Sequence, residues 1–214
     1  MMKSINIPFI ENVHSLTYSE MDQVMELNAG KDYISEVNWN SFPYKPSASF
    51  RIARSRTHLV IMYDVRGLDL RAVTLEENGP VWEDSCCEFF VSDNSDGTYY
   101  TFELNCIGTL LASKRRSKTD ADMYSEEQLA RIITHSTLER KQIEEGGVIR
   151  AWGTALCIPF DLIGLDEVCL PDSIRANFYK CADMAAHPHY LSWNRIDIPQ
   201  PDFHRPDFFG ELKF

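Results

Sequence analysis

Residues 81–105 read VWEDSCCEFFVSDNSDGTYYTFELN, a pattern typical of two β-strands joined by a polar turn. Successive side chains of a strand point to opposite faces. One face of the predicted hairpin is therefore apolar, and it consists of Cys87, Phe89, Val91, Tyr100, Phe102, Leu104 and Cys106. The opposite face carries the carboxylates of Glu88 and Glu103 and the amide of Asn105, with Trp82 at the strand entrance. Such a face is either ordinary solvated sheet or a site that hydrogen-bonds a polar ligand beneath an aromatic ring.

The rest of the chain also favours strands. Further strands are predicted at residues 48–53, 58–65, 108–113, 132–140, 148–158 and 173–182. Helical signals are few: a short helix at 18–27 with Ser19 as N-cap, a second beginning at Ser125, and one turn at 159–164. The sequence lacks the alternation of strands and helices that would indicate a parallel sheet. We therefore predict an all-β fold, a jelly-roll-like antiparallel β-sandwich with a few short helices.

Length and charge limit the organisation and the partners. A chain of 214 residues fits one domain spanning residues 1–214, with residues 1–33 as a peripheral N-terminal segment. The formal net charge is −11. Nucleic acids and anionic membranes are bound mainly through clustered Lys and Arg, so the charge argues against both partners. It is compatible with a neutral ligand, and the sequence does not determine the oligomeric state.

The six cysteines show neither a CxxC pair nor zinc-ligand spacing, which predicts buried, reduced thiols. The N-terminus lacks the long apolar core of a signal peptide. Both features favour a cytoplasmic, reducing location. Removal of a leader from a longer precursor would instead point to a secreted or periplasmic protein.

Aromatic rings beside polar groups suggest one specific ligand class. A sugar has an apolar face that packs on an indole and hydroxyl groups that hydrogen-bond carboxylates and amides. Trp39 and Trp152 lie in apolar runs typical of core. Trp82 follows Gly79-Pro80 and precedes Glu83-Asp84, and Trp193 lies between Ser192 and Asn194. Trp82 and Trp193 are therefore the candidates for a pair that sandwiches a sugar ring. The alternative is that both plug the ends of the sandwich.

Several segments, in order along the chain, resemble the family 9 carbohydrate-binding modules. The first is Trp82-x-Asp84-x-x-x-Glu88-Phe89-Phe90-Val91, which is followed by a Gly-containing turn and a second strand ending at Asn105. Residues 152–164, 175–179, 191–193 and 203–214 resemble later segments of the family. The resemblance implies a jelly-roll-like β-sandwich that binds saccharides without cleaving them. Such modules often accompany glycoside hydrolases in polysaccharide and glycan breakdown.

By motif position, the resemblance implies that Trp82 and Trp193 clamp a pyranose and that Glu88 bonds its hydroxyls. The strand alternation adds Asn105 as a second residue that meets the hydroxyls. The family's asparagine before the second tryptophan is replaced by Tyr190. The family's arginine has no clear counterpart, although Lys114, Arg115 or Arg175 could substitute. The expected saccharide-binding residues are Trp82, Glu88, Glu103, Asn105, Tyr190 and Trp193.

Other readings of the same residues remain open. Glu88 and Glu103 could face each other across neighbouring strands as a retaining glycosidase pair, which needs about 5–5.5 Å between carboxyls. A site that has lost sugar binding would leave a protein-interaction domain. We assign no catalytic residue and expect saccharide binding rather than hydrolysis.

Two metal readings also remain, although we assign no cofactor. The letters at Ser92, Asn94, Asp96 and Glu103 partly imitate a calcium loop, and an ordinary Asp/Asn/Gly turn explains them equally. Three histidines, His187, His189 and His204, could bind a metal or haem, although His-Pro-His spacing is a weak signal.

Overall fold

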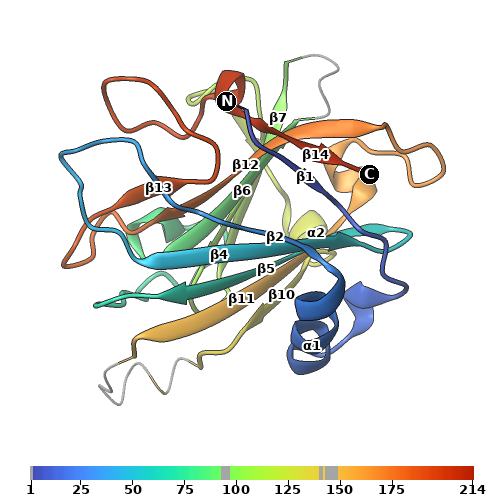
Figure 1. Cartoon of the computed structure of the whole chain (residues 1–214), viewed down its shortest axis with the longest axis horizontal. Coiled ribbons are helices and arrows are strands. Elements are labelled where there is room, and N and C mark those ends of the chain that lie inside the picture. The colour runs from blue at the N-terminus through green and yellow to red at the C-terminus, as the bar shows by residue number, and fades with distance from the viewer. Residues whose placement is uncertain (1, 93–96, 140–141, 143–148) are drawn as a thin grey trace.

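The computed structural model describes residues 2–92, 97–139, 142 and 149–214, which form two β-sheets packed face to face (Figure 1). The large sheet runs in the order β1 (Ser4–Asn6), β14 (Gly210–Lys213), β12 (Ser173–Cys181), β6 (Cys86–Ser92), β7 (Tyr99–Asn105), β8 (Leu110–Arg115) and β9 (Ala121–Met123). Beside β12 lie β13 (Tyr190–Ser192) and then β3 (Glu36–Val37). The small sheet runs β10 (Ile133–Ser136), β11 (Ala151–Pro159), β5 (His58–Arg66), β4 (Ser47–Arg54) and β2 (Gly30–Tyr33).

Helical elements are short and lie around these sheets. They are η1 (Val13–Ser15), α1 (Tyr18–Asn28), η2 (Val81–Glu83), α2 (Glu126–Leu129), η3 (Phe160–Ile163) and η4 (Pro206–Phe208). Among the strands of the described residues, pairs are antiparallel except for β1 and β14, which are parallel neighbours. The predicted all-β, jelly-roll-like antiparallel sandwich with a few short helices is confirmed.

The hairpin β6–β7 lies inside the large sheet and has the predicted alternation. Phe89 pairs with Phe102, and Glu88 pairs with Glu103. The apolar side of the hairpin faces the small sheet, where Phe50 stacks on Phe178 of β12 with ring centroids 3.6 Å apart. Burial of this continuous apolar layer is the main favourable term for such a sandwich.

Each sheet is also covered on its outer face. Helix α1 packs Met21 and Met25 onto the outer side of β4, β5 and β11 (Figure 1). Over the large sheet, long loops place Trp39, Ile196 and Phe203 against apolar residues of the outer face. The polar side of the hairpin is therefore overhung by loops and is not an open, solvated surface.

Local signals at the helix ends agree with the structure except at one cap. The N-cap of α1 is Thr17, which forms a capping box with Glu20, so the prediction of Ser19 is wrong by two residues. Ser125 caps α2 as expected. Residue 140, at the end of one predicted strand, and residue 148, at the start of the next, lie outside the described residues.

Five of the six cysteines are buried and free, and Cys169 is exposed and free. None of the helices in the described part of the chain is both long enough and apolar enough to cross a membrane.

Candidate functional site

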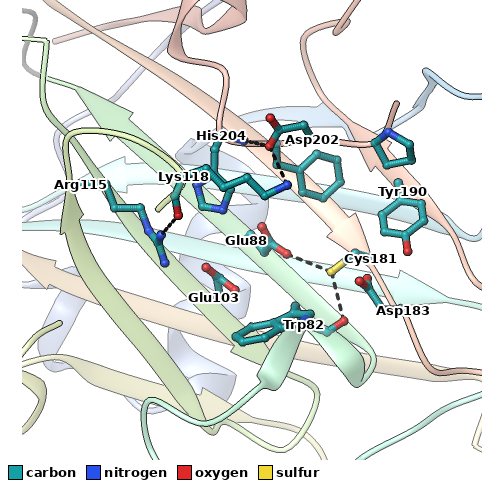
Figure 2. Close-up of a pocket in the computed structure, with 12 residues that line it drawn as sticks. Trp82, Glu88, Glu103, Arg115, Lys118, Cys181, Asp183, Tyr190, Asp202 and His204 are labelled. Atoms are coloured by element: carbon teal, nitrogen blue, oxygen red, sulfur yellow. Dashed lines mark hydrogen bonds and ion pairs between the residues drawn. The ribbon is translucent and has the colours of Figure 1, made fainter. Parts of the chain in front are cut away.

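A pocket of about 370 Å³ lies on the outer face of the large sheet, beneath the covering loops (Figure 2). Its walls come from η2, from β6, β7 and β8, from the ends of β12 and β13, and from the loop before η4. The lining residues are Trp82, Glu88, Glu103, Arg115, Lys118, Cys181, Asp183, Tyr190, Pro201, Asp202, Phe203 and His204.

The floor of the pocket carries two opposed carboxyl groups. Glu88 and Glu103 are directly paired across β6 and β7, and they are only 3% and 4% exposed. Burial raises the pKa of Glu88 well above its usual range, and the nearby Cys181 and Glu103 add to the effect. Burial raises the pKa of Glu103 to about 7, against the lowering effect of Arg115. Near neutral pH the floor therefore offers both a hydrogen-bond donor and acceptors.

Trp82 forms one wall of the pocket, and hydrogen bonds hold the backbone on both sides of it. Val81 is fully buried, whereas Trp82 is 39% exposed. The carbonyl oxygen of Trp82 accepts a hydrogen bond from the backbone N–H of Asp183 at 3.1 Å. The buried carboxylate of Asp84 accepts from the Arg71 guanidinium and from two backbone N–H groups of the preceding loop. These bonds hold the backbone of the turn from which the indole ring of Trp82 projects at the side of the pocket.

The opposite walls are polar and partly cationic. In Figure 2, Glu88 and Glu103 lie between Trp82 on one side and Arg115, Lys118 and His204 on the other. The Arg115 guanidinium donates to Ser113 Oγ at 2.9 Å and to the carbonyl of Lys118 at 2.8 Å. These bonds orient its planar group at the end of β8.

His204 belongs to the same side of the pocket. Its Nδ1 lies 3.2 Å from the hydroxyl of Tyr99. Burial lowers the pKa of His204 to about 4, with Arg115 as a further cause, so the ring is neutral near pH 7. It therefore contributes a polar, uncharged ring to the wall.

Tyr190 and Asp183 complete the rim. Burial raises the pKa of Asp183 to about 6, while a hydrogen bond from Tyr190 acts in the opposite direction. The Tyr190 ring packs edge-on against Phe42 with centroids 4.7 Å apart. One exposed indole, several carboxyls and an oriented guanidinium can together hold a ligand that has an apolar face and many hydroxyl groups.

Two predicted site residues do not reach this pocket. Trp193 is 0% exposed, so the prediction that it stacks on a sugar is wrong. Its ring packs between the sheets, edge-on to Phe50 and Phe178, and its Nε1 donates to Asp32 Oδ2 at 2.8 Å. A side chain at Gly210 would clash with the indole, so glycine is required there.

Asn105 is the second correction. It is fully buried, and its Nδ2 donates to Asp84 Oδ2 at 3.0 Å and to the carbonyl of Thr74 at 2.9 Å. Its amide therefore cannot meet ligand hydroxyls as predicted. Through Asp84 it instead helps to fix the turn that presents Trp82.

The other predicted residues, Trp82, Glu88, Glu103 and Tyr190, all line the pocket. Arg115, one of three possible substitutes for the family's arginine, lines it as well, whereas Lys114 and Arg175 do not. The lining residues that were not predicted as saccharide-binding residues are Lys118, Cys181, Asp183, Pro201, Asp202, Phe203 and His204. Most of them lie in loops, and loops have no periodic sequence pattern that predicts which side chains face the pocket.

The histidine cluster does not form in the described part of the chain. His189 Nε2 lies 2.9 Å from Lys180 Nζ, His187 lies beside Asp69, and His204 lies in the pocket. Asn94 and Asp96 of the possible calcium loop fall outside the described residues, so calcium binding there stays a prediction.

The fold and the overhung pocket define a β-sandwich with a site of ligand-binding size on its large sheet. The chain belongs to carbohydrate-binding family 9, whose sequence model matches residues 19–214. Among curated proteins, none is similar enough to count as a match.

Solved structures agree with this assignment. A protein from Bacteroides uniformis ATCC 8492, whose carbohydrate binding is itself only proposed, is 34% identical with a TM-score of 0.88 over 100% of both chains. A family 9 carbohydrate-binding module from Caldicellulosiruptor kristjanssonii in complex with glucose is 12% identical, with a TM-score of 0.64 over 99% of this chain and 95% of that one. A structure from the same organism with cellotriose has a TM-score of 0.62 at 12% identity, over 99% and 93% of the chains. At 12% identity these modules support the fold alone.

Proposed function

We propose that this protein binds a saccharide without cleaving it, with a pyranose ring against Trp82 and its hydroxyl groups on Glu88 and Glu103. The observation that carries the proposal is the exposed indole of Trp82 beside two opposed carboxyls in one pocket. Membership of carbohydrate-binding family 9 supports the same ligand class. Modules of this family from Caldicellulosiruptor kristjanssonii hold glucose and cellotriose, which makes these two sugars suitable probes.

The site suits a sugar for three physical reasons. An indole face attracts the C–H groups on one side of a pyranose. A guanidinium or an ionised carboxylate hydrogen-bonds hydroxyls more strongly than a neutral partner does. The volume of about 370 Å³ is near the lower end of the ~300–1,000 Å³ found for small-molecule sites. The pocket thus favours a short saccharide or the end of a longer chain, and such binding would serve glycan breakdown.

Because Trp193 is buried, the proposed contact uses one tryptophan and not two. Tyr190 is the aromatic residue at the rim near Asp183 in Figure 2, and its hydroxyl provides a further polar contact. Arg115 takes the role of the cationic hydrogen-bond donor to sugar hydroxyls.

Calorimetric titration of a panel that includes glucose and cellotriose tests the proposal. We expect the wild-type protein to bind at least one sugar of the panel at millimolar concentration or below, and Trp82→Ala to bind it more weakly. Leu75→Ala is the control, since Leu75 is an exposed apolar side chain that does not line the pocket. Absence of wild-type binding, or equal binding by Trp82→Ala, would contradict the proposed site.

Glycoside hydrolysis is a second candidate, favoured by the direct pairing of Glu88 with Glu103 and by the raised pKa of both groups. A glycosidase needs one protonated and one ionised carboxyl. Release of a chromogenic aglycone that is abolished in Glu88→Gln would support hydrolysis. Saccharide binding without any release would support binding alone.

A further inference from the structure

Two cysteine thiols lie beside Glu88 at the floor of the pocket. Cys86 and Cys181 are directly paired across β6 and β12, and Cys86 shares a strand face with Glu88. The sulfur atoms of both cysteines and a carboxyl oxygen of Glu88 all lie within 4.8 Å of one another. Cys181 Sγ donates to Glu88 Oε1 at 2.9 Å. Three potential metal ligands from two strands therefore converge on one point.

We propose that Cys86, Glu88 and Cys181 bind a soft divalent cation such as Zn²⁺, with an open coordination position toward the pocket. Thiolates favour Zn²⁺ and similar metals, whereas Ca²⁺ and Mg²⁺ require oxygen ligands. Three protein ligands with one open position form a known type of zinc site. Glu88 and Cys181 both line the pocket, so a water or a ligand oxygen can reach that position.

The chemistry of the buried carboxyl supports a cation at this point. Glu88 is 3% exposed, and a thiol is only a weak hydrogen-bond donor to it. A buried carboxylate is stabilised far more by a cation than by such a donor. On binding, the protons of the two thiols and of the carboxyl leave to solvent and three anionic ligands surround the cation.

The geometry requires only small movements. Zinc lies about 2.3 Å from thiolate sulfur and about 2.0–2.2 Å from carboxylate oxygen, so tetrahedral ligand atoms are roughly 3.5–4 Å apart. The three ligand atoms already lie within 4.8 Å of each other. The Cys181–Glu88 pair at 2.9 Å must open slightly, which the flexible glutamate side chain allows.

Cobalt substitution tests the site directly in the full chain. The reduced protein, freed of metal by a chelator, is titrated with Co²⁺ and then with Zn²⁺ under anaerobic conditions. We expect one equivalent of Co²⁺ to produce a sulfur-to-cobalt charge-transfer band, which Zn²⁺ removes. Cys86→Ser and Cys181→Ser should lose the band, and Glu88→Gln should weaken Co²⁺ binding at least tenfold. The matched control is Cys106→Ser, which removes a buried thiol outside the group and should keep the band.

X-ray absorption of the wild-type Zn²⁺ complex needs no variant and covers the case in which a serine variant fails to fold. The proposal predicts two sulfur neighbours at about 2.3 Å and one or two oxygen neighbours. A shell of nitrogen and oxygen alone, no charge-transfer band in wild type, or the same band in folded Cys181→Ser would overturn it. None of these readouts involves a sugar, so the metal site and the saccharide site stand or fall separately.

Discussion

Trp82 and Trp193 have the same side chain, and each is followed by a polar residue in sequence, yet they lie in opposite environments. Trp82 is held on η2 and leaves 39% of its surface exposed beside a pocket lined by acids. Trp193 is completely buried between the sheets, with its one polar atom bonded to Asp32. The comparison shows that an indole can stack on a ligand only where the chain leaves one of its faces uncovered.

The largest expected effect is on the free energy of unfolding when Trp193 is replaced. Trp193→Ala should lower the free energy of unfolding by about 3–5 kcal/mol, because it opens a cavity among Phe50 and Phe178 and leaves Asp32 without its donor. Urea denaturation measures this loss. Trp193→Phe, which keeps a ring, should lose less and remain foldable, with saccharide affinity unchanged. Wild-type stability together with lost sugar binding would show that Trp193 belongs to the site after all.

The second prediction concerns the pH dependence of the free energy of unfolding, to which Glu103 in the pocket contributes. The pKa of Glu103 is about 7 in the folded protein and near 4.5 in the unfolded chain. Its contribution to stability is therefore fully present below about pH 4.5 and is lost as pH rises through about 7, because the unfolded chain releases the proton first. We expect wild type to lose on the order of 3 kcal/mol relative to Glu103→Gln over this window.

Urea denaturation at about pH 4.5 and about pH 7.5, with a chelator present, measures this difference between wild type and Glu103→Gln. The control is Glu167→Gln, since Glu167 is an exposed glutamate that does not line the pocket. It should keep the wild-type pH dependence. Parallel pH profiles for wild type and Glu103→Gln would contradict the raised pKa.

Substitution of Trp82 should weaken saccharide binding and leave stability nearly unchanged, whereas substitution of Trp193 should lower stability and leave binding unchanged. Trp82→Ala should weaken saccharide binding by about 1–3 kcal/mol, by analogy with the stacking of bases on aromatic rings. Its free energy of unfolding should change by less than about 1 kcal/mol, because the ring is partly exposed. Calorimetric titration and urea denaturation of the same preparation separate the two effects. A large loss of stability without a loss of affinity would remove Trp82 from the site.

The smallest expected effect distinguishes two neighbouring arginines. Arg115 lines the pocket, whereas Arg116 is exposed and paired with Asp120 and Asp122. Arg115→Ala should weaken saccharide binding by about 1 kcal/mol through the loss of a charged hydrogen-bond donor. Arg116→Ala should leave affinity unchanged, and equal affinities for both variants in the titration would remove Arg115 from the site.

The parts of the site that sequence could predict depend on local patterns. The alternation in residues 86–105 correctly places Phe89 and Phe102 inward and Glu88 and Glu103 outward, since period two is a property of each strand alone. The environment of Trp193 could not be predicted, because the partner of its indole, Asp32, lies 161 residues away.

Asn105 failed as a site residue for a similar reason. Its amide is bonded to the buried carboxylate of Asp84, 21 residues earlier in the chain, and no periodicity reveals that contact. The loop residues Asp183 and His204 were missed because only the packed fold brings their loops over β6 and β7.

The most direct measurement is a titration with saccharide followed by the four tryptophan indole N–H signals in a ¹⁵N-correlated NMR spectrum. Trp82→Phe identifies one signal, and the buried tryptophans Trp39, Trp152 and Trp193 provide the other three. We expect the Trp82 signal to move when a sugar binds while the Trp193 signal stays in place. Movement of the Trp193 signal with a stationary Trp82 signal would contradict it.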